Sequence, residues 1–398
     1  MKKNEAIIKL TDQHVFQNYG RYPIVLVKGK GMHVWDKAGN KYLDFLAGVA
    51  VNNLGHCHPK VVTAIRKQAG QLMHVSNWFH IEPQSLLAQK LTQRSFAGKI
   101  FFCNSGTEAN EGAIKLARRY FYDRGEKARY EIITMQQAFH GRTLGSMAAT
   151  PQDKIQKGFG PLLPGFKYVP FDDMAAVKQA ITSKTCAVMV EPIQGETGVN
   201  IPHKRYLKEL RALCTRKKIL LILDEVQTGF GRTGTLFAYE NFGIKPDIMT
   251  LAKGLGCGFP IGALAATDKV ARSFGPGTHG STFGGNPLAC SAALAAFQVL
   301  SQKSFLRQVQ KTGQYFLSQL QELSRKCPAV GKVRGMGLIL AMDLVEASAP
   351  EVARECLQLG FLVNATGPGT LRFIPPLIVT RKDIDKLTRT LERIFKKL

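Results

Sequence analysis

The sequence has few of the features that mark a metal-binding, secreted or membrane protein. Its 398 residues include eight cysteines, but no two of them stand at CxxC spacing, so we expect no zinc or other metal site. The residues after Met1 form no apolar leader, which favours reduced thiols over a disulfide framework. The longest weakly polar run, residues 288–300, is too short to cross a bilayer. We therefore expect a soluble, cytoplasmic protein that does not bind membranes.

Acidic residues are scarce relative to basic ones. Lys and Arg together number 54 and Asp and Glu 29, so the formal net charge is +25. Such an excess raises the question of a nucleic-acid partner. The charge is spread along the chain, however, and short runs such as 216–218 are typical of solvated helix faces. We expect no nucleic-acid partner; a polyanion-binding protein, which would need a basic stripe with interleaved aromatic residues, is the competing hypothesis.

The order of apolar runs predicts an α/β fold. The first fifty residues show only brief strand-like runs, whereas from about residue 56 helical stretches alternate with continuously apolar strands. This alternation is typical of a mostly parallel sheet with helices on both faces. We expect an N-terminal segment over 1–50 that joins the small domain, a large domain over 51–287 and a smaller α+β domain over 288–398. The expected strands of the large domain are 132–135, 187–190, 219–223, 248–251 and 261–266, and its clearest helices are 59–70, 83–95, 107–122, 174–181 and 203–218.

A glycine-containing segment precedes one of these helices. The segment 104–110 (NSGTEAN) follows the apolar run 100–102. Glycine lets the backbone approach a ligand closely, and the free N–H groups at a helix N-terminus favour phosphate. An ordinary helix capped by serine or threonine is the alternative.

Two polar residues follow apolar strands. Asp224 stands at the edge where open parallel sheets place ligands, and it could hold a protonated ring nitrogen, hold a metal or cap a helix. Lys253 follows the next strand; burial there would lower its pKa and make it nucleophilic, whereas most lysines reach the surface. Sites for a phosphate, a pyridinium nitrogen and an aldehyde together match one cofactor, pyridoxal 5'-phosphate.

With these motifs the chain resembles the class III (ω-amino acid) aminotransferases of the fold-type I pyridoxal phosphate enzymes. The resemblance covers nearly the whole length, and it implies a large cofactor-binding domain with a mostly parallel central sheet and a smaller α+β domain. The motifs that carry it are, in order, 54–59 (LGHCHP), 104–110, 139–143 (FHGRT), 191–196 (EPIQGE), 224–229 (DEVQTG), 253–254 and 279–287 (HGSTFGGNP).

The resemblance implies roles for individual residues. Lys253 should bind the cofactor as a Schiff base and later move a proton at the substrate carbon, and Asp224 should keep the ring nitrogen protonated. Thr282 should reach the phosphate of the neighbouring subunit, which implies an obligate homodimer with shared active sites. The other expected cofactor contacts are Ser105, Gly106 and Thr107 at the phosphate, Phe139 and Val226 on the ring faces, Gln227 at the ring hydroxyl, and Glu225.

Two arginines resemble the carboxylate-binding residues of the family. Arg142 is similar to the one that binds the α-carboxylate of the ω-amine donor and the distal carboxylate of glutamate. Arg372 is similar to the one that binds the α-carboxylate of glutamate. Glu196 resembles a switch residue that neutralises Arg372 while the donor is bound, with a purely structural ion pair as the alternative, and Ser281 is expected to touch the donor.

The runs 35–48, 76–77 and 371–377 are typical of the branch that acts on acetylornithine. The resemblance therefore implies transfer of the δ-amino group of N2-acetyl-L-ornithine to 2-oxoglutarate, giving N-acetyl-L-glutamate 5-semialdehyde and L-glutamate, a step of arginine biosynthesis. The run 78–80 (WFH) departs from the branch, which often ends there in Tyr, so ornithine, succinylornithine, N-succinyl-diaminopimelate and 4-aminobutyrate remain alternative donors.

Decarboxylases and racemases fit less well because they do not need two carboxylate-binding arginines and a switch. An inactive scaffold is disfavoured by the intact pair of Lys253 and Asp224.

Overall fold

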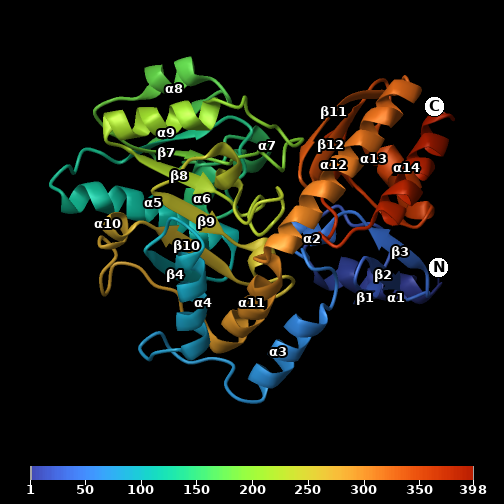
Figure 1. Cartoon of the computed structure of the whole chain (residues 1–398), viewed down its shortest axis with the longest axis horizontal. Coiled ribbons are helices and arrows are strands. Elements are labelled where there is room, and N and C mark those ends of the chain that lie inside the picture. The colour runs from blue at the N-terminus through green and yellow to red at the C-terminus, as the bar shows by residue number, and fades with distance from the viewer. Residues whose placement is uncertain (1, 398) are drawn as a thin grey trace.

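A seven-stranded sheet forms the largest layer of the structure, a computed structural model that describes residues 2–397 (Figure 1). The strand order is β4-β10-β9-β8-β7-β5-β6. β10 runs antiparallel to both of its neighbours, and the pairs from β9 through β6 are all parallel. The expectation of a mostly parallel sheet is therefore confirmed. The strands are β4 (Lys99–Cys103), β5 (Glu131–Met135), β6 (Phe166–Val169), β7 (Thr185–Val190), β8 (Leu220–Asp224), β9 (Ile248–Leu251) and β10 (Gly262–Ala266).

Helices cover both faces of this sheet. Strand β8 is buried along its whole length, and its side chains alternate between the two faces. Leu223 shares an apolar cluster with α9 (Tyr206–Lys217). Ile222 shares another cluster with α5 (Gly106–Asp123). The alternation consequently turns Asp224, the last residue of β8, toward the face covered by α5.

Two four-stranded sheets lie beside the large one. Their orders are β1-β2-β3-β13 and β11-β12-β15-β14. β13 pairs in parallel with β3, so the C-terminal part of the chain contacts the first fifty residues. The domain boundaries expected at residues 51 and 288 stay a prediction. The strands are β1 (Leu26–Lys30), β2 (His33–Asp36), β3 (Lys41–Asp44), β11 (Val330–Met336), β12 (Ile339–Leu344), β13 (Phe361–Leu362), β14 (Asn364–Ala365) and β15 (Thr370–Phe373).

The remaining helices form two groups (Figure 1). Helix α11 packs against α3 and α4 near the large sheet, and α12 packs against α14 and β11 on the small sheet. The helices are α1 (Lys2–His14), α3 (Pro59–Ala69), α4 (Glu82–Gln93), α6 (Leu144–Ala148), α7 (Asp153–Gln156), α8 (Met174–Ala180), α10 (Asp268–Ala271), α11 (Pro287–Leu300), α12 (Lys303–Lys326), α13 (Ala349–Gln358) and α14 (Arg381–Phe395), with short 3-10 turns at η1 (Ala238–Phe242) and η2 (Lys253–Leu255).

Several elements were not expected from the sequence, among them α1, α13 and β6. Helix α1 is mostly polar, so its apolar residues show little periodicity. The buried side chains of α13 are mainly small ones, which also weakens the helical pattern. Strand β6 is a short edge strand that is only partly buried.

A short left-handed turn, α2 (Ala47–Ala50), lies between the sheets. All four of its residues have positive φ, between 53° and 61°. The Asp44 carboxylate accepts hydrogen bonds from the N–H groups of Leu46 (2.7 Å) and Ala47 (2.9 Å), which holds the start of the turn. The next residue, Val51, lines the cavity described below.

Across residues 2–397, no helix is both long and apolar enough to span a membrane. The same part of the chain shows no cluster of His, Cys, Asp or Glu arranged to hold a metal ion. All eight cysteines are unpaired, with Cys57 exposed and the others buried.

Candidate active site

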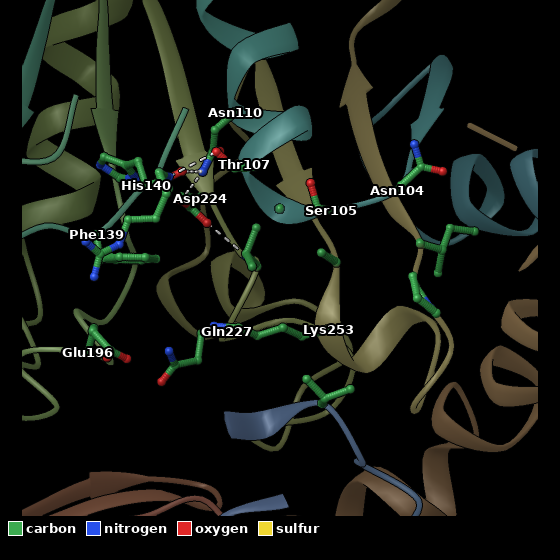
Figure 2. Close-up of a pocket in the computed structure, with 18 of the residues that line it drawn as sticks. Asn104, Ser105, Thr107, Asn110, Phe139, His140, Glu196, Asp224, Gln227 and Lys253 are labelled. Atoms are coloured by element: carbon green, nitrogen blue, oxygen red, sulfur yellow. Dashed lines mark hydrogen bonds and ion pairs between the residues drawn. The ribbon is translucent and has the colours of Figure 1, made fainter. Parts of the chain in front are cut away.

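A cavity of about 420 Å³ lies between the carboxyl ends of β8 and β9 and the N-terminus of α5 (Figure 2). This is the edge at which open parallel sheets place their ligands. Most of the residues predicted from the sequence line it together: Ser105, Gly106, Thr107, Phe139, Arg142, Glu196, Asp224, Val226, Gln227 and Lys253. Glu225, Ser281, Thr282 and Arg372 are not among its lining residues.

The Asp224 carboxylate is held by three hydrogen bonds. Its Oδ2 accepts from Asn110 Nδ2 at 2.8 Å and pairs with His140 Nδ1 at 2.8 Å, and its Oδ1 accepts from the N–H of Val226 at 3.0 Å (Figure 2). The carboxylate is 4% exposed, so these donors replace most of its water. These donors fix the direction of the buried carboxylate.

Sequence reasoning did not single out the partners of Asp224. Asn110 and His140 are both buried and lie inside the motifs 104–110 and 139–143. Membership of these motifs was the only indication in the sequence that they belong to the site, because residue spacing alone cannot show which group a buried amide or imidazole contacts. Asn110 Nδ2 also donates to the carbonyl of His140 at 2.6 Å, so the three side chains form one connected network.

The N-terminus of α5 forms a tight cradle. Ser105 is its N-cap, and its hydroxyl accepts from the N–H of Glu108 at 3.3 Å. By helix geometry the N–H groups of Gly106 and Thr107 have no intrahelical acceptor. A Cβ at Gly106 would lie only 2.7 Å from a methyl carbon of Val226, so glycine is required there by space. The segment 104–110 therefore combines the two structures considered for it. It is a helix capped by serine, and its first N–H groups remain open to an anion such as phosphate.

Lys253 lies at the floor of the cavity, directly after β9. Its backbone has a left-handed φ of 44°, which is uncommon for a residue with a long side chain. Burial lowers the pKa of Lys253, and the nearby charge of Arg372 acts in the same direction, although the Glu196 carboxylate opposes it. The amine is thus easier to deprotonate than an exposed lysine, which is what a nucleophilic amine requires.

A buried carboxyl, Glu191, joins two loops of the site. Its Oε1 accepts from the N–H of Phe139 at 3.0 Å, and its Oε2 accepts from the N–H of Gly195 at 3.4 Å. Burial raises the pKa of Glu191, although the neighbouring His140 opposes the shift. Glu191 was recognised only as part of the motif 191–196, and its position indicates that it holds the loop that bears Glu196.

Arg372 and Glu196 form an ion pair at the edge of the cavity. Arg372 Nη1 lies 2.8 Å from Glu196 Oε2 and also donates to the carbonyl of Gly195 at 2.7 Å, while its Nε donates to Asn364 Oδ1 at 2.9 Å. The arginine side chain is 2% exposed and the glutamate side chain 39%. Burial alone would raise the pKa of Glu196, but the charge and hydrogen bond of Arg372 outweigh it and lower this pKa.

The second predicted arginine has a different environment. Arg142 is exposed at the cavity, and its guanidinium lies 5.8 Å from the centre of the Phe139 ring. The backbone N–H of Arg142 donates to the hydroxyl of Thr107 at 3.2 Å, which links this loop to α5. Arg142 forms no ion pair within residues 2–397, so the site holds one neutralised, buried arginine and one accessible arginine without a carboxylate partner.

Besides Arg372, three predicted residues lie outside the cavity: Glu225, Ser281 and Thr282. The Glu225 carboxylate accepts from the N–H groups of Ala238 (2.5 Å) and Tyr239 (2.8 Å) at the start of η1, and burial raises its pKa to about 8. Glu225 therefore does not line the cavity, because alternation along the chain after β8 turns its side chain into the core. Ser281 Oγ accepts from Asn104 Nδ2 at 3.2 Å, and Thr282 is exposed.

The residues present fit pyridoxal phosphate. The cavity ends on one side at the open N–H groups of α5 and contains a buried, hydrogen-bonded carboxyl group in Asp224 and a buried amine in Lys253. A phosphate, a protonated ring nitrogen and an aldehyde need these three partners. The absence of a side chain at Gly106, where a Cβ would meet Val226, lets the phosphate approach the backbone closely.

Comparison with known proteins supports the same chemistry. The family model "Aminotransferase class-III" matches residues 15–395. The acetylornithine aminotransferase of Methanocaldococcus jannaschii is 52% identical over 98% of both chains, and that of Caldanaerobacter subterraneus is 50% identical over 98% of this chain and all of the relative.

Solved structures agree along the full length. The ornithine aminotransferase of Toxoplasma gondii superposes with a TM-score of 0.96 at 36% identity, covering 100% of this chain and 96% of the other. The acetylornithine aminotransferase of Elizabethkingia anophelis gives a TM-score of 0.90 at 34% identity, covering all of both chains. The chain thus belongs to the class III aminotransferases, the pyridoxal phosphate-dependent family that its sequence motifs resemble.

Proposed function

We propose that this enzyme transfers the δ-amino group of N2-acetyl-L-ornithine to 2-oxoglutarate, giving N-acetyl-L-glutamate 5-semialdehyde and L-glutamate, as a step of arginine biosynthesis. The observation that carries the proposal is the buried Arg372, neutralised by Glu196 beside Lys253, while Arg142 stays free. One arginine can then bind a donor with a single carboxylate, and both can bind a dicarboxylate. The relatives named acetylornithine aminotransferases support the choice of donor.

Pyridoxal phosphate, when bound, supplies an aldehyde for exchange with amines and a ring that accepts electrons from the substrate carbon. Lys253 Nζ is the proposed attachment point, and its lowered pKa favours the neutral amine that can take and return the proton at that carbon. Asp224 would hold the proton on the ring nitrogen. Asn110 and His140 form hydrogen bonds with the Asp224 carboxyl group and fix its direction.

Other residues orient the cofactor. The N–H groups of Gly106 and Thr107, with the hydroxyl-bearing Ser105, would receive the phosphate. Val226 and Phe139, which both line the cavity, would confine the ring by apolar and stacking contacts and exclude water. Gln227 is the proposed partner of the ring hydroxyl, and it lies close enough to the Arg372 guanidinium (3.5 Å) to connect cofactor and substrate sites.

Substrate selection follows from charge. With acetylornithine bound, Arg142 forms two parallel hydrogen bonds to the α-carboxylate, and Glu196 keeps Arg372 neutralised. With glutamate or 2-oxoglutarate bound, the side chain of Glu196 moves toward solvent, which its 39% exposure allows. Arg372 then binds the α-carboxylate and Arg142 the distal carboxylate.

The active enzyme is proposed to be a cytoplasmic homodimer. Large apolar side chains are exposed beside the predicted shared site, including Trp78 (91%) and Phe283 (59%). Asn77 Nδ2 donates to the carbonyls of Ser281 (3.2 Å) and Gly284 (2.9 Å), so both exposed loops form one surface. A second copy would cover this surface and receive Thr282 at its phosphate site.

A panel of half-reactions tests the donor. The pyridoxal form is mixed separately with acetylornithine, ornithine, succinylornithine, N-succinyl-diaminopimelate and 4-aminobutyrate, and its conversion to the pyridoxamine form is followed by absorbance. Acetylornithine should react with the largest kcat/KM. The proposed donor is wrong if another amine reacts as fast or faster, and light scattering that reports a monomer would refute the dimer.

A further inference from the structure

Arg232 is a buried cation without a carboxylate partner. Its side chain is 0% exposed, and it forms no ion pair among the residues that the structure describes. Its Nη1 donates to the carbonyls of Pro375 (2.5 Å) and Leu338 (2.9 Å), and its Nη2 donates to Asn53 Oδ1 (2.8 Å). A buried charge that is met only by neutral acceptors is costly, so its presence points to a role other than stability.

The partners of Arg232 come from three separate parts of the fold. Leu338 lies in the turn between β11 and β12, and Pro375 follows β15 by two residues. Asn53 lies two residues after Val51, which lines the cavity. Backbone hydrogen bonds reinforce the junction, from the N–H of Leu338 to the carbonyl of Arg232 (2.9 Å) and from the N–H of Leu377 to that of Asn53 (2.7 Å).

Arg372 lies close to this junction along the chain. Arg372 is carried by β15 of a small sheet, whereas Glu196 and Lys253 are carried by loops of the seven-stranded sheet. The 2.8 Å contact between Arg372 and Glu196 therefore depends on how the two sheets are attached. Arg232 follows Gln227 in the loop after β8 and donates a hydrogen bond to the carbonyl of Pro375, three residues beyond Arg372.

We propose that Arg232 is a positioning residue for the dicarboxylate half-reaction: it holds Arg372 at the distance from the cofactor site at which glutamate and 2-oxoglutarate are captured. The inference rests on the proposed function only through the role of Arg372. The donor half-reaction depends instead on Arg142, which belongs to the large sheet's own loops. Arginine is needed because its planar fork reaches acceptors on opposite sides at once, and a lysine ammonium on one stem cannot.

Separate half-reactions test this role. In the holoenzyme Arg232→Lys should raise the half-saturating concentration of 2-oxoglutarate about tenfold, as expected when charge-assisted hydrogen bonds that fix a binding group are lost. The half-saturating concentration of the amine donor should change less than about twofold. Asn53→Ala removes one acceptor of Arg232 and keeps the arginine. It should raise the half-saturating concentration of 2-oxoglutarate more than that of the donor, but by less than Arg232→Lys does. This variant replaces Arg232→Lys if the latter does not fold.

A matched control and a double mutant separate positioning from general destabilisation. Arg211→Lys alters a partly buried arginine that pairs with Asp247 at 2.6 Å away from the cavity, and it should leave both constants unchanged. In an Arg372→Lys background, Arg232→Lys should have little further effect on 2-oxoglutarate, because the coupling acts through Arg372.

Equal changes in both half-reactions, in Arg232→Lys and in Asn53→Ala, would overturn the proposal, as would full additivity with Arg372→Lys. The proposed donor can fail independently. If the wild-type enzyme rejects acetylornithine, the same comparison is made with whichever amine reacts, and the 2-oxoglutarate constant still decides the role of Arg232.

Discussion

Glu196→Gln should shift the enzyme's preference from the ω-amine donor toward glutamate. Glutamine keeps the size of the side chain and one oxygen that can accept from Arg372, but it removes the negative charge. Arg372 retains its bonds to the carbonyl of Gly195 and to Asn364, so its orientation should persist. The variant therefore isolates neutralisation of Arg372 from its placement.

The magnitude follows from the geometry of the pair. A hydrogen bond to a charged group contributes about 1.5–3 kcal/mol when both partners are buried. Arg372 is buried but the Glu196 side chain is 39% exposed, and solvent screening places the loss near the lower end, about 1.5 kcal/mol. This corresponds to about a tenfold change in the relative use of the two amines.

The assay compares single half-reactions of the pyridoxal form with acetylornithine and with glutamate. The ratio of their kcat/KM values should move about tenfold toward glutamate in Glu196→Gln. Glu126→Gln, which alters a carboxylate paired with Arg129 away from the cavity, is the control and should leave the ratio unchanged. A ratio that stays constant, or moves toward acetylornithine, would refute the switch role of Glu196.

The pH dependence has a defined sign. The pKa of Glu196 is lowered, because Arg372 outweighs the effect of burial. The ion pair is consequently complete above the usual glutamate value of 4.5 and is lost only as the pH falls through the lowered pKa. The wild-type ratio should therefore stay constant across neutral pH and approach that of Glu196→Gln only in acid.

Three further predictions concern covalent attachment, stability and thiol access. Lys253→Ala should abolish turnover and the visible band of the cofactor–lysine linkage, and a retained band in the absorbance spectrum would place the linkage elsewhere. Glu225→Gln should reduce the free energy of unfolding by about 1–3 kcal/mol, because an NH2 group would then face the N–H of Ala238 or Tyr239. Urea titration measures this loss, and unchanged stability together with weaker cofactor binding would return Glu225 to the cofactor site. A chromogenic thiol reagent should label Cys57 rapidly and the other seven cysteines only after unfolding, since they are buried; a second fast thiol would contradict the packing.

Much of the large sheet could be predicted because its strands are continuously apolar. The runs that end at Asp224 and precede Lys253 gave both the strands and their ligand-facing ends, since every side chain of β8 and β9 is buried. The same pattern could not show that β10 runs antiparallel to its neighbours, because burial on two faces leaves strand direction open.

The parts of the site that escaped prediction depend on long-range contacts. Arg232 and Asn53 are 179 residues apart, and neither their spacing nor their residue types indicates that they meet. Glu225 shows the opposite case: its neighbours line the cavity, but its own side chain accepts backbone N–H groups of η1. Sequence motifs identify segments, whereas the direction of each side chain is set by the tertiary structure.

The left-handed turn α2 makes part of the active site dependent on segments that are distant in the sequence. Three of its four residues are not glycine, and each costs about 1 kcal/mol or more in this conformation. An isolated chain would therefore leave the turn, which persists because Asp44 caps it and because Val49 packs with Ile374 beyond β15. The wall that Val51 contributes to the cavity thus depends on contacts beyond β15, so a substitution there would alter the pocket without changing any residue that lines it.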